Sequence, residues 1–164
     1  MPENSTKVTS LDIEIAVAKL FNPRINIIVP NITWGMGFKY ELDMLIITPA
    51  GYGYEIEIKT SLSDFLLDIK KRHFHDSKRI KKFYYAMPDY LLEKCEKHIS
   101  GDTGIISIKD GEANIIRESK IRNNFKFSTG DISNLTRLGT MRIWTLKRII
   151  QDKHKIKCRR MNDG

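Results

Sequence analysis

Hydrophobic residues recur along this chain with two different periods, which predict helices in some segments and strands in others. Apolar residues three and four apart predict a first helix over 10–21, with Thr9 or Ser10 as its cap and acids in its first turn. The same spacing predicts helices over 63–72, 89–98 and 131–152. Short apolar or alternating runs predict strands over 25–29, 42–48, 54–60, 82–87, 104–108 and 113–116.

The order of these elements predicts an α/β fold, in which a central mixed sheet is flanked by helices. The short turn at 49–51 should join 42–48 and 54–60 as a hairpin, and Asp110-Gly111 should join the last two strands as an extra pair. The final helix is long, and we expect its apolar residues to pack on the core. This packing set comprises Ile132, Leu135, Leu138, Met141, Trp144 and Ile149.

The length of 164 residues suits one domain covering 1–164, with flexible ends expected at 1–8 and 153–164. No apolar run approaches the roughly 20 residues of a membrane helix, and the polar N-terminus lacks the apolar core of a secretory signal. Cys95 and Cys158 form no CxxC pair, which argues against a thiolate metal site or a disulfide framework. We therefore expect a cytoplasmic protein without a membrane partner.

The net charge of +8 favours a polyanionic partner, and the distribution of the basic residues indicates where such a partner could bind. Basic residues cluster in 70–82 and again in 147–160, whereas the chain between them is close to neutral. Two such groups could form the walls of a phosphate-binding surface, or they could be ordinary solvated faces.

The segment 54–60 carries the candidate chemistry, because strict alternation places Glu57 and Lys59 on one face of a strand. Burying both charges in a plain core would be costly, so the structural alternative is an exposed, half-polar hairpin. Pairing of the two strands would bring Asp43 near Glu57, and two adjacent carboxylates repel unless a cation lies between them. Oxygen ligands suit Mg²⁺ or Mn²⁺, and a neighbouring lysine can orient water or neutralise charge on a phosphate. This pattern predicts metal-dependent phosphodiester hydrolysis.

Around this set the sequence resembles the PD-(D/E)xK nuclease superfamily, and more narrowly its MmcB-like branch and related phage or bacterial DNA-repair proteins. The resemblance implies a restriction-endonuclease-like fold, a divalent metal and DNA cleavage in repair, recombination or phage DNA processing. It assigns Asp43 and Glu57 as metal ligands, Lys59 as the catalytic lysine, and Glu14 as the acid on the first helix. Leu42 stands where the family often has Pro. The stretches that carry the resemblance are Val29-Pro-Asn-Ile-Thr-Trp-Gly-Met36, Tyr40-Glu-Leu-Asp43, Glu55-Ile-Glu-Ile-Lys-Thr-Ser61 with Ser63-Asp-Phe65, Phe83-Tyr-Tyr-Ala-Met-Pro88 and Leu138-Gly-Thr-Met-Arg-Ile-Trp-Thr-Leu-Lys147.

Further residues near the motif are candidates for DNA contacts. Ser61, Lys70, Lys71 and Arg72 could contact phosphates, and Trp34, in a loop with Gly35 and Gly37, could stack on a base or anchor that loop.

Three more polar groups accompany these candidates. Asp64 and Asp68 share one helix face, which should point towards Lys59 or towards the basic residues at 70–72. His73 and His75 are expected to be surface or phosphate contacts, because no third ligand pattern supports a metal site there.

Three other functions share this sequence pattern. The chain could be a catalytically silent DNA-binding module of the same fold, or a protein-interaction subunit whose basic face meets an acidic partner. RNA cleavage would use the same chemistry. A homodimer is compatible with the sequence, which sets neither the oligomeric state nor the DNA structure cleaved.

Overall fold

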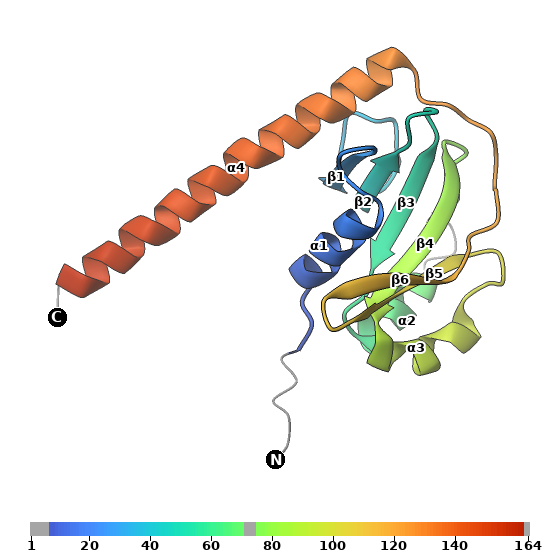
Figure 1. The fold of residues 1–164 in the computed structure, drawn as a ribbon, viewed down its shortest axis with the longest axis horizontal. Helices are drawn as coiled ribbons and strands as arrows, with labels where there is room; N and C mark the ends of the chain where they lie inside the picture. Colours follow the sequence, from blue (N-terminus) through green and yellow to red (C-terminus); the bar gives the residue numbers. More distant parts are fainter. Residues whose placement is uncertain (1–6, 71–74, 163–164) are drawn as a thin grey trace.

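The computed structural model describes residues 7–70 and 75–162, with side chains described as far as residue 155. It is an α/β structure in which a mixed sheet is flanked by helices and a long C-terminal helix projects away from the body (Figure 1). The helices are α1 (Ser10–Leu20), α2 (Leu62–Lys70), α3 (Asp89–Cys95), the short 3₁₀ helix η1 (Glu96–His98) and α4 (Thr129–Asn162). The strands are β1 (Ile27–Ile32), β2 (Leu42–Ile47), β3 (Gly53–Ile58), β4 (Ile80–Pro88), β5 (Gly104–Lys109) and β6 (Glu112–Arg117).

Within the described residues the strands follow one another across a single sheet in the order β1-β2-β3-β4-β5-β6. The pairs β1/β2, β2/β3 and β5/β6 are antiparallel, which confirms the predicted hairpin and the extra strand pair. The pairs β3/β4 and β4/β5 are parallel, and α2 and α3 supply the crossovers that parallel neighbours require. The predicted α/β class with a mixed sheet is therefore confirmed.

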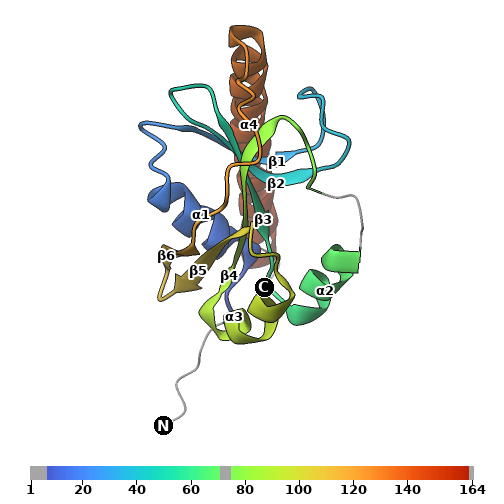
Figure 2. The ribbon, with the colours of Figure 1, turned by 90° about the vertical axis from the view of Figure 1, so that its right-hand side faces the viewer.

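Helices cover both faces of the sheet, as the view along its edge shows (Figure 2). Helix α1 packs on one face against β3, β4 and β6, and α2 lies on the other side. Each face has its own apolar cluster, because alternating strand residues point to opposite sides. Ile56 and Ile58 of β3 join the α1 cluster, so Glu55, Glu57 and Lys59 must point towards α2.

The start of α1 shows how local sequence sets an element boundary. Thr9 is the N-cap, and a capping box joins it to Asp12: the Asp12 N–H donates to the Thr9 hydroxyl, and the Thr9 N–H donates to the Asp12 carboxylate at 2.8 Å. At the start of α2 the Ser61 hydroxyl accepts the N–H of Asp64 at 3.2 Å.

The long α4 corrects two expectations and confirms a third. The helix does not end near residue 152, because its helical backbone continues to Asn162. Its first turns pack as predicted, with Leu135 and Leu138 buried. Met141, Trp144 and Ile149 do not pack on the core, however, and the Trp144 side chain is 65% exposed. The apolar pattern continues along α4 after the helix has passed the edge of the body (Figure 1), so periodicity alone overstated the packing.

Arg79 joins three segments that are distant in the sequence. Its guanidinium donates to the backbone carbonyl of Met36 and to the Asp131 carboxylate at 2.7 Å, and it lies 4.9 Å from the Phe127 ring centre. The loop after β1, the start of β4 and the start of α4 are thereby fastened together. Among the described segments, no helix combines the length and apolarity needed to cross a membrane.

Candidate metal and nucleic-acid site

Asp43 and Glu57 lie side by side on the hairpin of β2 and β3. The antiparallel register pairs Met44 with Ile56, which places the preceding Asp43 next to the following Glu57. One oxygen of Asp43, Oδ2, accepts the N–H of Ile58 at 2.7 Å, which fixes the carboxylate against the neighbouring strand. The structure therefore brings together the two acids that alternation and the short turn had predicted to meet.

Lys59 completes this set from the same face of the strand. Its Nζ lies 2.7 Å from Glu57 Oε1 and 3.5 Å from Asp68 Oδ1, and Asp64 lies 3.9 Å away. Asp64 and Asp68 thus share a helix face, as their spacing predicted, and of the two directions left open this face points towards Lys59. Lys59 and Glu57 are only 4% and 7% exposed, so the alternative of an exposed, half-polar hairpin is wrong.

The two carboxyl groups have raised pKa values, and burial is the first cause of each shift. Burial, followed by the charge of Asp43, raises the pKa of Glu57 to about 7 despite the nearby Lys59. Burial also raises the pKa of Asp43, although the N–H of Ile58 opposes this. Burial on its own would lower the pKa of Lys59, but the facing Glu57 outweighs it and the pKa is raised, so the lysine is cationic at neutral pH.

Glu14 reaches the same region from α1. It is partly buried, and its pKa is raised by burial and then by the charge of Asp43. The side chain of Asn31 and the charge of Arg142 act in the opposite direction and lower this pKa. Asn31 lies opposite Asp43, since Pro30 pairs with Met44 and Ile32 with Leu42.

Asp43, Glu57 and Glu14 are the sequence-predicted residues that could hold a divalent cation. Their donors are carboxylate oxygens, the kind of ligand that Mg²⁺ and Mn²⁺ prefer. The pKa values of all three are raised, with burial as the first cause. The Ile58 N–H and Lys59 hydrogen-bond one oxygen of Asp43 and one of Glu57, so each of these two carboxylates has a second oxygen to offer. Glu41, two residues before Asp43, is exposed, unlike these acids.

A buried polar network beside this site was missed by sequence reasoning. His75, expected at the surface, is 7% exposed, and its two ring nitrogens lie 2.5 Å from Glu55 Oε1 and 3.1 Å from Asp68 Oδ2. The Tyr40 hydroxyl donates to Glu55, and the Tyr85 hydroxyl donates to Asp68. The expectation for His75 is therefore wrong. Glu55 lies on a covered strand face, and its buried carboxylate is stabilised by a buried partner, His75.

Ligand atoms of Glu55, Glu57 and His75 lie within 4.8 Å of one another among the described residues, so this group could also hold a metal. In this structure the imidazole lies between the carboxylates of Glu55 and Asp68. Burial would lower the pKa of His75, but hydrogen bonds to Asp68 and Glu55 raise it to about 9. A metal ion at this position would have to displace the proton of the imidazole, because a protonated ring has no free lone pair. The group is best explained as an ion cluster that supports the sheet beneath Lys59.

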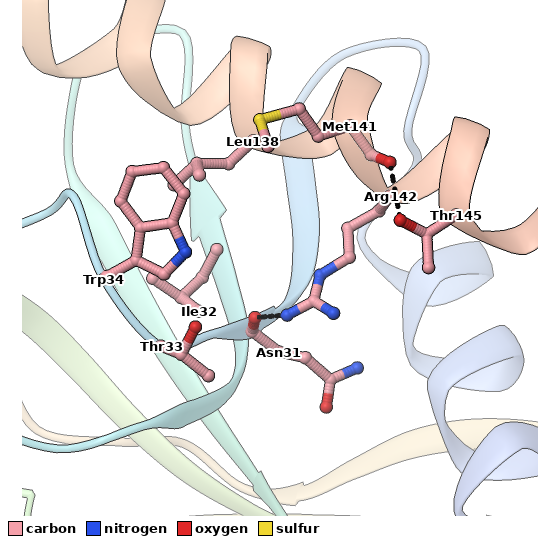
Figure 3. Close-up of a pocket in the computed structure, with 8 residues that line it drawn as sticks. All are labelled: Asn31, Ile32, Thr33, Trp34, Leu138, Met141, Arg142 and Thr145. Carbon is pink, nitrogen blue, oxygen red and sulfur yellow. Dashed lines mark hydrogen bonds between the residues drawn. The ribbon is translucent and has the colours of Figure 1, made fainter.

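The predicted DNA contacts are only partly placed. Lys70 is exposed at the end of α2, whereas Lys71, Arg72 and His73 lie outside the described residues. Ser61 caps α2 and is partly buried. Trp34 is 55% exposed, so it does not anchor its loop by burial, and it lines a pocket shared with α4 (Figure 3).

Comparison with known proteins identifies the fold only. A scan of protein-family models and a search of curated proteins both find no match. Among solved structures, the chain is similar to the SPO1766 protein of unknown function from Silicibacter pomeroyi, with a TM-score of 0.60 and 16% sequence identity. The similarity covers 87% of this chain and 90% of that chain, so the two proteins share a fold over nearly their whole length.

Proposed function

We propose that this protein is a divalent-metal-dependent deoxyribonuclease of the PD-(D/E)xK type. The observation that carries the proposal is the row of Asp43, Glu57 and Lys59 on one sheet face, in which Glu57 and Lys59 are buried, Asp43 is partly buried, and two carboxylates with raised pKa values adjoin a cationic lysine. A plain structural sheet gains nothing from removing such charges from water, whereas a hydrolytic site needs them.

Each side chain has a role that its position supports. Asp43 and Glu57 would hold Mg²⁺ or Mn²⁺, with Glu14 as a further ligand from α1. When bound, such an ion polarises the phosphodiester and makes a coordinated water more acidic. Lys59, fixed by Glu57 at 2.7 Å, is placed to orient the attacking water and to neutralise charge that develops on the phosphate. Asp68 and His75 position Lys59 from below without contacting the substrate.

The partner inferred for this site is DNA in the cytoplasm, during repair, recombination or phage DNA processing. The net charge of +8 and the cationic side chains near the acids support a polyanion. Three alternatives remain as outcomes of experiment: a silent DNA-binding module, a basic subunit with an acidic protein partner, and a ribonuclease.

The test is a cleavage assay on a panel of labelled DNA structures with Mg²⁺ or Mn²⁺. The panel holds duplex, single strand, flap, overhang and junction substrates, and a matched RNA is included. We expect cleavage of at least one DNA by wild type, and a loss of roughly 100-fold or more in Asp43→Asn. Glu41→Gln is the matched control, because it removes the same charge from an exposed position on the same chain segment.

Equal cleavage by wild type and Asp43→Asn would contradict the proposal. Metal binding and DNA binding without cleavage of any substrate would favour the silent module. Failure to bind DNA at any salt concentration would favour the protein-interaction subunit, and cleavage confined to RNA would favour the ribonuclease.

A further inference from the structure

A small pocket lies between the loop after β1 and the side of α4. Its volume is about 200 Å³, below the roughly 300–1,000 Å³ of sites for drug-sized ligands, so it suits a group the size of one base. Figure 3 shows Trp34 and Arg142 on opposite sides of the pocket, with Leu138 and Met141 between them on α4. Asn31 and Thr145 add polar groups on the Arg142 side.

Trp34 is presented on a loop that other residues hold in place. Met36, two residues further on, is buried in the core at 1% exposure, and Arg79 donates to its carbonyl. Gly35 between them has a φ of +82°, a conformation that other residues rarely adopt. The loop is thus anchored without the indole, and the Trp34 ring stays 55% exposed beside the pocket. An exposed aromatic face on a fixed backbone is suited to stacking on a base.

Arg142 supplies the matching charge. Its guanidinium donates to the Asn31 backbone carbonyl, which holds the side chain at the pocket. Arginine has five N–H donors, and within the described part of the chain this hydrogen bond uses one of them. The geometry leaves the guanidinium able to pair with a phosphate while it remains attached to β1.

The pocket adjoins the acidic row through Asn31. The side chain of Asn31 acts on the pKa of Glu14, and the residue lies opposite Asp43 in the β1/β2 register. A nucleotide bound between Trp34 and Arg142 would therefore be separated by Asn31 from the acids that act on the scissile phosphate.

We propose that the Trp34–Arg142 pocket binds one unpaired nucleotide beside the scissile bond, so that the substrate is DNA with a single-stranded segment. The inference rests on the proposed nuclease function and names its substrate class. A base inside a duplex has its faces covered by stacking, so only an unpaired base can lie against Trp34.

The test measures binding without cleavage, in EDTA, by fluorescence anisotropy. The probes are a blunt duplex, the same duplex with a five-nucleotide unpaired extension at either end, the single strand and a matched RNA. We expect Trp34→Ala to weaken binding of the extended duplex roughly tenfold and to leave the blunt duplex unchanged. Trp34→Phe should restore most of the affinity, whereas Trp34→Leu should not, because stacking rather than apolarity is required.

Trp144→Ala is the matched control, since Trp144 is also an exposed tryptophan but lies outside the described lining of the pocket. A 2-aminopurine in the extension gives a direct signal, and its quenching should disappear in Trp34→Ala and persist in Trp144→Ala. Thermal melts of both variants should match wild type, as both side chains are exposed.

Equal binding of the extended duplex by wild type and Trp34→Ala would overturn the inference, as would equal losses in both tryptophan variants. Tighter binding of the RNA than of the DNA would overturn the DNA assignment. The two proposals fail separately: cleavage that ignores Trp34 rejects the pocket alone, and Trp34-dependent binding without cleavage rejects the nuclease alone.

Discussion

The buried histidine should make stability depend on pH in a way that a surface histidine would not. The pKa of His75 rises from 6.5 to about 9 in the folded protein, because its hydrogen bonds to Asp68 and Glu55 outweigh the effect of burial. A difference of one in pKa corresponds to about 1.4 kcal/mol, so this change corresponds to about 3 kcal/mol. Since the folded state binds this proton more tightly than the unfolded state, the stabilisation is complete below pH 6.5 and is lost as pH rises through 9.

The assay compares urea unfolding of wild type and His75→Gln at intervals from pH 6 to pH 9.5. Wild type should be more stable at pH 6, and most of the 3 kcal/mol that His75 contributes should disappear towards the alkaline end. The variant lacks this dependence, so the gap between the two proteins should narrow. His98→Gln is the control, because His98 is exposed on η1 and should leave the wild-type curve unchanged. Parallel pH curves for wild type and His75→Gln would refute the assigned ion cluster.

Two further predictions concern the scaffold. Gly104→Ala should lower the free energy of unfolding by about 2 kcal/mol, because its new Cβ would collide with the Tyr84 ring. Gly101→Ala is the control: a Cβ there meets no atom within 4 Å, so the free energy of unfolding should change by less than about 0.5 kcal/mol. Equal urea midpoints for the two variants would contradict the packing described. Thr9→Ala should cost about 1 kcal/mol by removing the capping box with Asp12, and an unchanged melting temperature would show that the cap is not formed in solution.

The part of the site formed by local pattern was predictable from sequence. Alternation along β3 placed Glu57 and Lys59 on one face, and the short turn to β2 brought Asp43 beside them. The same reasoning put Asp64 and Asp68 on one face of α2, where both approach Lys59. These relations depend on the periods of a strand and a helix, which the chain carries in its order of polar and apolar residues.

Contacts in the site between residues far apart in the sequence could not be predicted. His75 meets Glu55 across 20 positions of sequence, and no periodicity connects a loop histidine with a strand carboxylate. Asn31 reaches Glu14 because β1 extends to Ile32, beyond the strand end predicted from apolar residues. The predicted packing of Trp144 was wrong for a different reason: an amphipathic pattern does not show how far along a helix the rest of the protein extends beneath it.

Calorimetric titration of Mn²⁺ into the DNA-free protein tests most directly whether the carboxylates form a metal site. Wild type and Lys59→Ala should each bind Mn²⁺, because the lysine is not a ligand, while Asp43→Asn and Glu57→Gln should lose this binding. Lys59→Ala should then fail to cleave DNA although it retains the metal, which separates the roles of ligand and lysine. Undiminished Mn²⁺ binding by Asp43→Asn and Glu57→Gln would contradict the account.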